Sequence, residues 1–470
     1  MNRLRGIHTV SIGRNRGKGR IWLENLSLLD ADFTPGTPVT IEYGHTITIR
    51  KAEDDGDIHI SSRKRKGHET PILDLNSETI SDYFTYKEKI RVEIQQGEIR
   101  ISKLQSFRIV EDNAPSQVTT MEKFQVVELP SGAGLGGYAF ENTGLFEVAV
   151  AGDIDMTALE ALRYNQPNPV LYWSNMFDIH QDDIPSSDVF IFTPDCTPFS
   201  RLGRRNYVCS ASAPMVHHGL RIISAKRFPV VLIENVPEFG NSSFYQHYKR
   251  MMVEMDYNVS DRVLQAWDFG TIASRPRFIS VAVQKPFEFE FPEPNLNAAH
   301  RDKVKKFVRE IEDRKWMSIS ENRTLRFFFG EHRSEQMAKG NGFGISEDSL
   351  VTLDHKRIPA FIANYHKIQS TGPFLRHPKN PNLLSMFEPN EILAIQGFND
   401  YEMPEHLSKS TQYRLIGQAI CGRMFRALAV AVASVLMQMR LRVSSKRRTK
   451  ETKQHRFSKA TQLDLGLNFA

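Results

Sequence analysis

Two short apolar runs, each followed by a chemically reactive side chain, most constrain how this chain of 470 residues can fold. Val189 to Phe192 leads through Thr-Pro-Asp to Cys196, and Val231 to Ile233 leads directly to Glu234. Runs of this length and composition predict buried strands. Because ligands of doubly wound sheets bind beyond the carboxyl ends of the strands, we expect the thiol and the carboxyl group to meet there. This pattern predicts covalent catalysis by a cysteine with an acid partner.

The length and the cysteine content set the frame for this interpretation. A chain of 470 residues predicts two or three domains. Its three cysteines, Cys196, Cys209 and Cys421, form no CxxC pair, so no metal site is predicted, and a sparse, odd set fits a reducing compartment. We find no apolar run long enough to cross a bilayer and no signal peptide, which predicts a cytoplasmic protein without a membrane partner.

The positive charge of the chain is concentrated near its C-terminus. Residues 440–459 contain nine basic residues and one acidic residue, Glu451, so this segment accounts for more than the whole net charge of +6. A basic tail attracts phosphate without reading sequence, and a merely solubilising tail is an equally open interpretation.

The first part of the chain contains an internal duplication of alternating, β-rich sequence. Phe33 aligns with Phe84, Val39 with Ile90, Ile41 with Val92 and Tyr43 with Ile94, and after a one-residue slip Ile49 aligns with Ile101. This predicts two hairpin-containing copies in a module over residues 1–120, with a basic linker at 63–67. The phrase that begins at Phe33 resembles the AbrB-like swapped-hairpin family, so the module is a candidate for DNA binding, dimerisation or a plain structural cap.

The middle of the chain alternates between strands and helices. Strands are predicted at 124–129, 148–154, 189–192, 230–233 and 278–283, which is typical of a doubly wound, mostly parallel Rossmann-like sheet. A glycine turn, Ser131-Gly132-Ala-Gly134, joins the first strand to a helix, and Asp153 ends the next strand. An acid about 20 residues after such a turn is where a nucleotide ribose is held.

These motifs together resemble the DNA (cytosine-5) methyltransferases. The glycine turn, the Cys196 loop and Glu234-Asn-Val occur in the order of that family, followed by Arg275-Pro-Arg277, by Asn390-Glu391 with its Gln-Gly-Phe, and by Arg414-Leu-Ile-Gly-Gln418. The resemblance covers roughly residues 124–437 and implies methyl transfer to C5 of a cytosine that is flipped out of double-stranded DNA.

The resemblance also implies roles for particular residues. The implied catalytic residues are Cys196, which adds to C6, Glu234, which holds N3, and Arg275 and Arg277, which contact the nucleotide. Two plainer interpretations stay open: the arginines could belong to a solvated strand end, and the cysteine could be a small buried residue. S-adenosyl-L-methionine is the implied cofactor. Its implied binding residues are Ser131, Gly132, Gly134, Asp153 at the ribose, Ile154 at the adenine face, Asp178 and Ile179 at the adenine edge, and Gln418.

Several positions depart from the family pattern, and three of them bear on the activity. Pro130 replaces an aromatic residue, Asp195 replaces a proline beside the thiol, and Thr197 replaces a glutamine. An aspartate at position 195 disfavours the thiolate form of Cys196. Two other functions therefore stay open: an enzyme that acts on RNA or with a modified sulfonium cofactor, and a catalytically altered or inactive relative that acts as a DNA-binding regulator or anti-restriction protein.

The remaining segments complete the predicted domain order. The catalytic domain spans 124–285 and returns at 374–437, with a helix that begins near Glu388 and a long helix from about 415 to 436, while the irregular residues 286–373 correspond to a target-recognition domain. A basic, disordered tail is predicted over 438–470. Its Gln462-Leu463-Asp-Leu465-Gly-Leu467 resembles the peptide by which bacterial proteins dock on the replication sliding clamp. We therefore expect a nucleoid-associated bacterial enzyme of the restriction-modification type.

Overall fold

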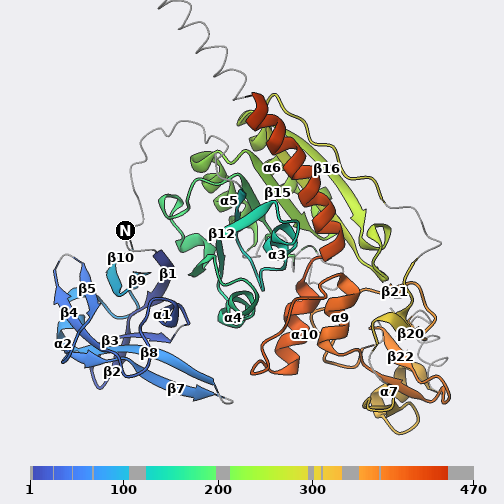
Figure 1. Ribbon diagram of the computed structural model, residues 1–470, viewed down its shortest axis with the longest axis horizontal. Coiled ribbons are helices and arrows are strands. Elements are labelled where there is room, and N and C mark those ends of the chain that lie inside the picture. The colour runs from blue at the N-terminus through green and yellow to red at the C-terminus, as the bar shows by residue number, and fades with distance from the viewer. Residues whose placement is uncertain are drawn as a thin grey trace, which may run out of the picture.

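The computed structural model has at its centre a sheet whose middle strands are parallel, with helices on both faces of these strands (Figure 1). The described residues are 4–24, 26–44, 46–65, 68–104, 123–196, 199, 212–294, 301–308, 311–330, 349–369 and 372–442. The proposed clamp peptide and Thr197 lie outside these residues.

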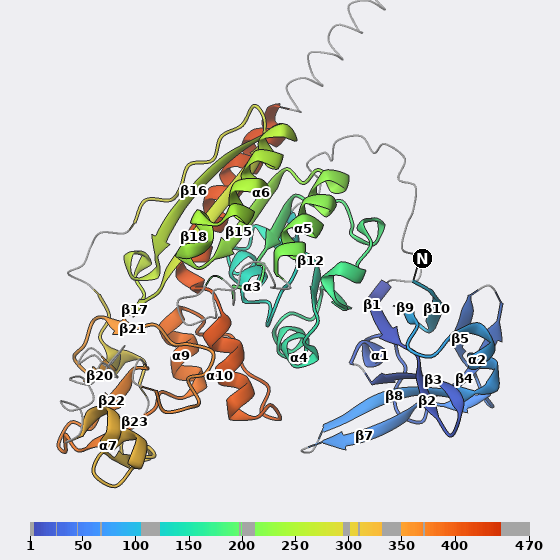
Figure 2. The ribbon, with the colours of Figure 1, turned by 180° about the vertical axis from the view of Figure 1, so that it is seen from behind.

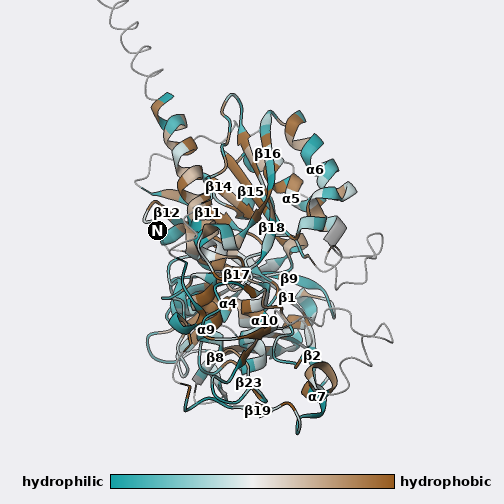
Figure 3. Ribbon diagram, turned by 90° about the vertical axis from the view of Figure 1, so that its right-hand side faces the viewer, coloured by the Kyte–Doolittle hydropathy of each residue, from teal (hydrophilic) through white to brown (hydrophobic). Residues whose placement is uncertain are grey.

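Five parallel strands form the middle of this sheet in the order β15, β14, β11, β12, β13. They are β11 (Phe124–Glu128), β12 (Phe146–Asp153), β13 (Val170–Trp173), β14 (Val189–Phe192) and β15 (Val230–Asn235). Antiparallel β18 (Pro276–Gln284) and β16 (Tyr257–Gln265) continue it beyond β15. Every residue of β14 and β15 is buried because both faces are covered, and both strands are hydrophobic in Figure 3.

Two hydrophobic cores lie on the two faces of the sheet. One face packs against α3 (Leu135–Glu141), α4 (Met156–Asn165) and the long helix Gly422–Arg442. The other face packs against α5 (Ser212–Lys226) and α6 (Ser243–Glu254), with Ile223, Tyr245 and Tyr248 buried against β15. Figure 2 shows α5 and α6 in front of the strands. This three-layer arrangement leaves the carboxyl ends of the parallel strands for a site.

The long C-terminal helix differs from its sequence expectation in two ways. The helix predicted over 415–436 is broken into α10 (Lys409–Gln418) and Gly422–Arg442, because the backbone at Ala419 is extended. The second helix is long and apolar enough to span a membrane by length and composition, so the expectation of no such segment is wrong by this criterion. Half of its most apolar window is buried inside the protein, where Leu428, Val432 and Leu436 belong to the core.

The N-terminal module consists of two copies of one arrangement: a strand, a hairpin, a short helix and a second hairpin. The first copy has β1 (Leu4–Ser11), β2 (Gly13–Asn15), β3 (Lys18–Glu24), α1 (Ser27–Asp30), β4 (Pro38–Tyr43) and β5 (Ile47–Lys51). The second has β6 (Ile58–His59), β7 (Ser61–Arg65), β8 (His68–Ser77), α2 (Glu78–Tyr83), β9 (Lys89–Gln95) and β10 (Glu98–Lys103). The copies interlock through the pairs β3–β8 and β5–β10. The aligned pairs Phe33 and Phe84, Val39 and Ile90, and Ile49 and Ile101 are buried in their shared core.

The module and the catalytic sheet are continuous. Strand β1 pairs in parallel with β13, with Gly6 opposite Leu171 and His8 opposite Trp173. On its other side β1 pairs with β9, so one sheet of the described residues runs through thirteen strands from β16 to β6. Without the module, β13 would be an exposed edge strand of the parallel part of the sheet, and the module covers it.

Residues 301–385 form a smaller unit beside α10 and α9 (Pro389–Gln396) (Figure 1). A small sheet has the order β19 (Met317–Ser318), β23 (Leu383–Ser385), β22 (Phe374–Arg376), β20 (Leu350–Val351), and α7 (Arg323–Phe329) packs nearby. Short β17 (Ala273–Ser274) and β21 (Ile358–Pro359) pair in parallel, which connects this unit to the end of the catalytic sheet.

Candidate active site

The glycine turn between β11 and α3 is shaped by a buried acid that the sequence analysis did not single out. Gly132 and Gly134 have φ values of 52° and 72°, which favour glycine. Glu128, at the end of β11, accepts a hydrogen bond from the Gly137 N–H at 3.0 Å. A Cβ on Gly136 would lie 2.2 Å from Glu128 Oε1, so a residue with a side chain does not fit there. Burial raises the pKa of Glu128 to about 8. A single charged residue at the end of an apolar strand was the available sequence signal.

Asp153 connects the glycine turn to the end of β12. Its carboxylate accepts from the Gly132 N–H at 2.7 Å and from the Asp155 N–H at 2.9 Å. Desolvation raises the pKa of Asp153, and these backbone donors oppose that shift. The structure thus brings the predicted ribose-binding acid onto the turn, while Asp155 pairs with Arg414 of α10 at 2.7 Å.

Cys196 follows β14 on a segment that two side chains hold in place. Thr193 Oγ1 donates to the Pro130 carbonyl at 2.7 Å, and Asn235 Nδ2 donates to the Pro194 carbonyl at 2.8 Å. Asn235 is the middle residue of the Glu-Asn-Val motif, so its amide ties the acid strand to the thiol segment. The Cys196 thiol itself is exposed to the cavity.

The electrostatic surroundings of the thiol are largely unfavourable to a thiolate. Desolvation by the surrounding protein raises the pKa of Cys196, and the charges of Glu234 and Asp195 raise it further, whereas Arg277 and Arg275 lower it. Desolvation also raises the pKa of Glu234. A protonated Glu234 carries no charge that would repel the thiolate. The raised pKa of Glu234 therefore favours a neutral carboxyl group beside Cys196.

Arg277 and Arg275 have different positions although they stand two residues apart. Arg277 Nε lies 2.7 Å from Glu234 Oε1, and both side chains keep some exposure. Arg275 is buried, and its guanidinium donates to the carbonyls of Phe361, Gly417 and Ala419 at 2.8, 2.8 and 2.5 Å. Arg275 therefore satisfies carbonyls left by the break after α10, and these contacts differ from its predicted role at the nucleotide. Its pKa is lowered to about 9, mainly by desolvation and then by Arg277.

A cavity of about 380 Å³ brings most of the predicted residues together. Its lining includes Ser131, Gly132, Asp153, Ile154, Cys196, Glu234 and Gln418. Two predicted residues at the adenine edge, Asp178 and Ile179, are not part of this lining: Ile179 is buried, and Asp178 pairs with Lys89 of the N-terminal module. Gly134 lies beneath the turn, where a Cβ would lie 2.5 Å from Leu162.

The chemistry of the lining fits a cationic ligand. Glu128, Asp153, Asp155, Asp195 and Glu234 all contribute carboxyl groups. Arg414, the basic residue of this lining, is neutralised by Asp155. A sulfonium group is compatible with such a site, as is a ligand whose hydroxyl groups donate to Asp153.

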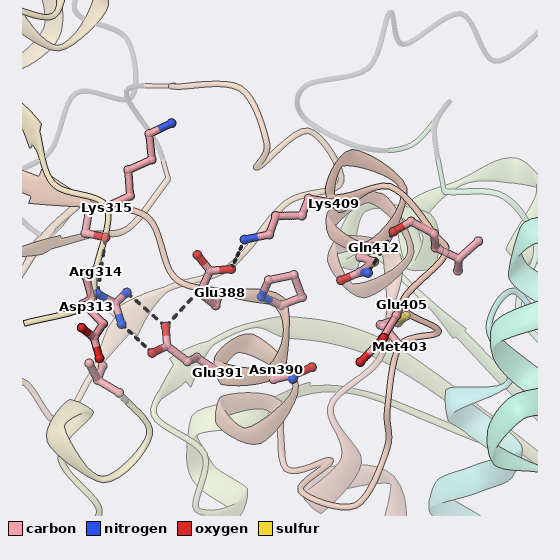
Figure 4. Close-up of a pocket in the computed structure, with 14 residues that line it drawn as sticks. Asp313, Arg314, Lys315, Glu388, Asn390, Glu391, Met403, Glu405, Lys409 and Gln412 are labelled. Carbon is pink, nitrogen blue, oxygen red and sulfur yellow. Dashed lines mark hydrogen bonds and ion pairs between the residues drawn. The ribbon is translucent and has the colours of Figure 1, made fainter. Parts of the chain in front are cut away.

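A second cavity, of about 1100 Å³, lies between α9, α10 and the segment around residue 314 (Figure 4). Arg314 points toward Glu391, and its Nη1 and Nη2 lie 2.5 and 3.1 Å from the two carboxylate oxygens. Glu391 also accepts from the Glu388 N–H at 2.9 Å, which caps α9. Lys409 pairs with Glu388 at 2.7 Å. The Arg314–Glu391 pair attaches the 301–385 unit to α9, the Lys409–Glu388 pair joins α10 to the start of α9, and none of these four residues lines the Cys196 cavity.

Comparison with known proteins agrees with this geometry. Type II methyltransferase M.MspI of a Moraxella species is 27% identical over 358 residues, which cover 74% of this chain and 79% of that protein. Type II methyltransferase M.NgoPII of Neisseria gonorrhoeae is 22% identical over 346 residues, covering 68% and 98%. The solved structure of the Entamoeba histolytica methyltransferase EhMeth shares the fold, with a TM-score of 0.55 at 21% identity, covering 66% of this chain and 98% of that one. The model of the C-5 cytosine-specific DNA methylases matches residues 124–434, more than half of the chain, so this protein belongs to that family.

Proposed function

We propose that this protein transfers a methyl group from S-adenosylmethionine to C5 of a cytosine flipped out of double-stranded DNA, through a covalent bond between Cys196 and C6. The observation that carries the proposal is that Cys196, Glu234, the glycine turn and Asp153 face one cavity. A thiol, a protonatable carboxyl group and a nucleotide-type turn in one place fit this reaction better than any of them does alone.

The residues have complementary roles in the proposed reaction. The Cys196 thiolate forms a bond to C6, and the ring electrons move toward C5 and N3. Glu234, whose pKa is raised by desolvation, supplies a proton or a hydrogen bond at N3, which stabilises the negative charge on the ring. Transfer of the methyl group to C5 would break a carbon–sulfur bond of the sulfonium and leave S-adenosylhomocysteine. A water molecule then removes the C5 proton, the C6–sulfur bond breaks to return the Cys196 thiolate, and any proton given to N3 returns to Glu234.

The cofactor would occupy the part of the cavity lined by Ser131, Gly132, Asp153, Ile154 and Gln418. S-adenosylmethionine bound there would supply an electrophilic methyl group. The Asp153 and Asp195 carboxylates of the lining would stabilise a sulfonium charge, and the Gly132 turn leaves the backbone accessible because a Cβ there would meet nothing within 4 Å. Asp153 would accept from ribose hydroxyls.

The DNA would contact the target-recognition region predicted over residues 286–373, part of which belongs to the 301–385 unit. The proposed tail contacts are separate: the basic residues after Arg440 attract phosphate, and Gln462 to Leu467 docks on a sliding clamp. We place the protein in the cytoplasm, at the nucleoid of a bacterial cell. The names of the relatives suggest a methyltransferase of the restriction-modification type.

The proposal is tested by sequencing DNA from methylation-free cells that express wild type, Cys196→Ala or Cys421→Ala. Cys421 is a matched control because it is a free cysteine that is buried in the core and is not one of the residues that line the cavity. We expect 5-methylcytosine within one short motif in wild type and Cys421→Ala, and none in Cys196→Ala. Unmodified cytosine in every sample, with folded protein present, would refute the DNA reaction and favour an RNA substrate or a DNA-binding role.

A further inference from the structure

The N-terminal module contacts the loop in which the adenine edge of the cofactor is expected. This loop follows β13 and contains two short turns, η1 (Met176–Asp178) and η2 (Gln181–Asp183). It begins at Ser174, whose hydroxyl donates to Thr9 Oγ1 of β1 at 2.7 Å. The module therefore holds the start of the loop as well as the edge of the sheet.

Two cations on β9 reach the acids that end these turns. Lys89 Nζ lies 2.5 Å from Asp178 Oδ2, and Arg91 pairs with Asp183. The Asp178 and Asp183 side chains are only 14% and 6% exposed, so both carboxylates are screened from water. Ion pairs in this environment contribute more than fully exposed pairs, because solvent weakens them less.

The internal duplication supplies a comparison within the same chain. With Val39 aligned to Ile90, the first copy has Pro38 and Thr40 where the second copy has Lys89 and Arg91. Strand β4 of the first copy lies far from the catalytic part, next to the two-residue strand β6. The cations thus occur on β9, the strand of the second copy that reaches the cofactor loop, and are missing from the equivalent positions of β4 in the first copy, which lies far from that loop.

We propose that the N-terminal module is part of the cofactor site, with Lys89 as a positioning residue that holds Asp178 and its turn in place for the adenine. This inference rests on the proposed function and on the adenine of the cofactor reaching beyond the cavity lining to this loop, since Asp178 and Ile179 do not line that cavity. Arg91 holds the second turn through Asp183. Removing Lys89 loosens the loop before the cofactor binds, so the cost falls on cofactor affinity rather than on the chemical step.

The test uses the full-length protein with Lys89→Ala, Lys89→Arg and Lys103→Ala. Lys103 is a matched control: it lies on the adjacent strand β10 and pairs with Glu88 at 3.6 Å. Calorimetry would measure the affinity for S-adenosylhomocysteine, and kinetics would separate KM for S-adenosylmethionine from kcat. We expect Lys89→Ala to weaken binding and raise KM about fivefold with kcat unchanged. Arginine should restore most of the affinity, and Lys103→Ala should behave as wild type.

Hydrogen exchange of residues 174–184 without ligand is a second readout, because a loosened loop exchanges faster in Lys89→Ala. If wild type binds and Lys89→Ala binds equally well with unchanged exchange, the inference is overturned while the proposed function stands. If wild type binds neither adenosyl compound, the proposed cofactor site fails and the inference fails with it. Combining Lys89→Ala with Asp178→Ala should cause no further loss of affinity beyond Asp178→Ala alone.

Discussion

Replacement of Arg275 by methionine should destabilise the fold by about 3 kcal/mol. The substitution keeps most of the side-chain volume but leaves the carbonyls of Phe361, Gly417 and Ala419 without their donor. An unsatisfied buried acceptor costs about 1–3 kcal/mol. We take about 1 kcal/mol for each of the three, the lower limit, because removal of a desolvated guanidinium offsets part of the loss. Equilibrium urea unfolding, followed by circular dichroism, measures this difference through the midpoint.

Arg277→Met is the matched control for this measurement, since the same substitution is made two residues away. Its partner Glu234 can take up a proton once the guanidinium is gone, because desolvation already raises the pKa of Glu234 and Arg277 opposes that rise. We therefore expect a loss of stability below ~1 kcal/mol, together with a loss of methyl transfer on the order of 10²-fold. If Arg275→Met unfolds at the wild-type urea concentration while losing as much activity as Arg277→Met, Arg275 acts on the nucleotide and this reasoning is refuted.

Two further predictions concern the pH dependence of the site. Asp195→Asn should shift the rising limb of the pH–rate profile to lower pH, because the Asp195 charge raises the pKa of Cys196; an unchanged profile would show that this charge does not act on the thiol. The pKa of Glu128 is raised from 4.5 to about 8 in the folded protein. The contribution of Glu128 to stability is therefore complete below pH 4.5 and is lost as the pH rises through about 8. Relative to Glu128→Gln, wild type should lose up to about 1.4 kcal/mol per pH unit in this window; parallel curves of unfolding free energy against pH would contradict it.

The parts of the fold with strong local signals could be predicted from the sequence. Buried parallel strands are continuous apolar runs, and Val189–Phe192 was predicted with the bounds that the structure has. The helix after Glu388 also begins where it was expected, because an acidic residue followed by proline is a strong start signal. These features depend on a few neighbouring residues, which a sequence displays directly.

Other parts depend on contacts between distant segments. Strand β13 was not predicted, because four residues, Val170 to Trp173, carry little periodicity, yet β13 is where the module joins the catalytic sheet. The break after α10 was missed because the apolar pattern continues across it. Its consequence was missed too, since only the fold shows that Arg275 lies beside the freed carbonyls.

The residues of the candidate site divide in the same way, into those that a local sequence pattern predicts and those whose contacts only the fold shows. Cys196, Glu234 and Asp153 could be predicted because each lies at or just beyond the carboxyl end of a strand, and these ends face the same edge of the sheet. The groups that tune them come from elsewhere. Glu128 acts through glycines eight and nine residues later in the chain, and Asn235 acts through the Pro194 carbonyl, in the segment that follows another strand. Their positions follow from packing and hydrogen bonds that no short motif records.

The two copies of the N-terminal module show how a repeated sequence acquires two different environments. The edge strand of one copy, β1, has eight residues and lies between β9 and β13, whereas its counterpart β6 has two residues and ends the sheet. A long edge strand offers unpaired backbone groups, and here the catalytic sheet uses them; the short counterpart offers few. The cations that reach Asp178 and Asp183 belong to the strand beside β1. The pairing of β1 with β13 and the ion pairs with the loop after β13 therefore both depend on the difference between the two copies. Both contacts support a structural role for the module at the proposed cofactor end of the sheet.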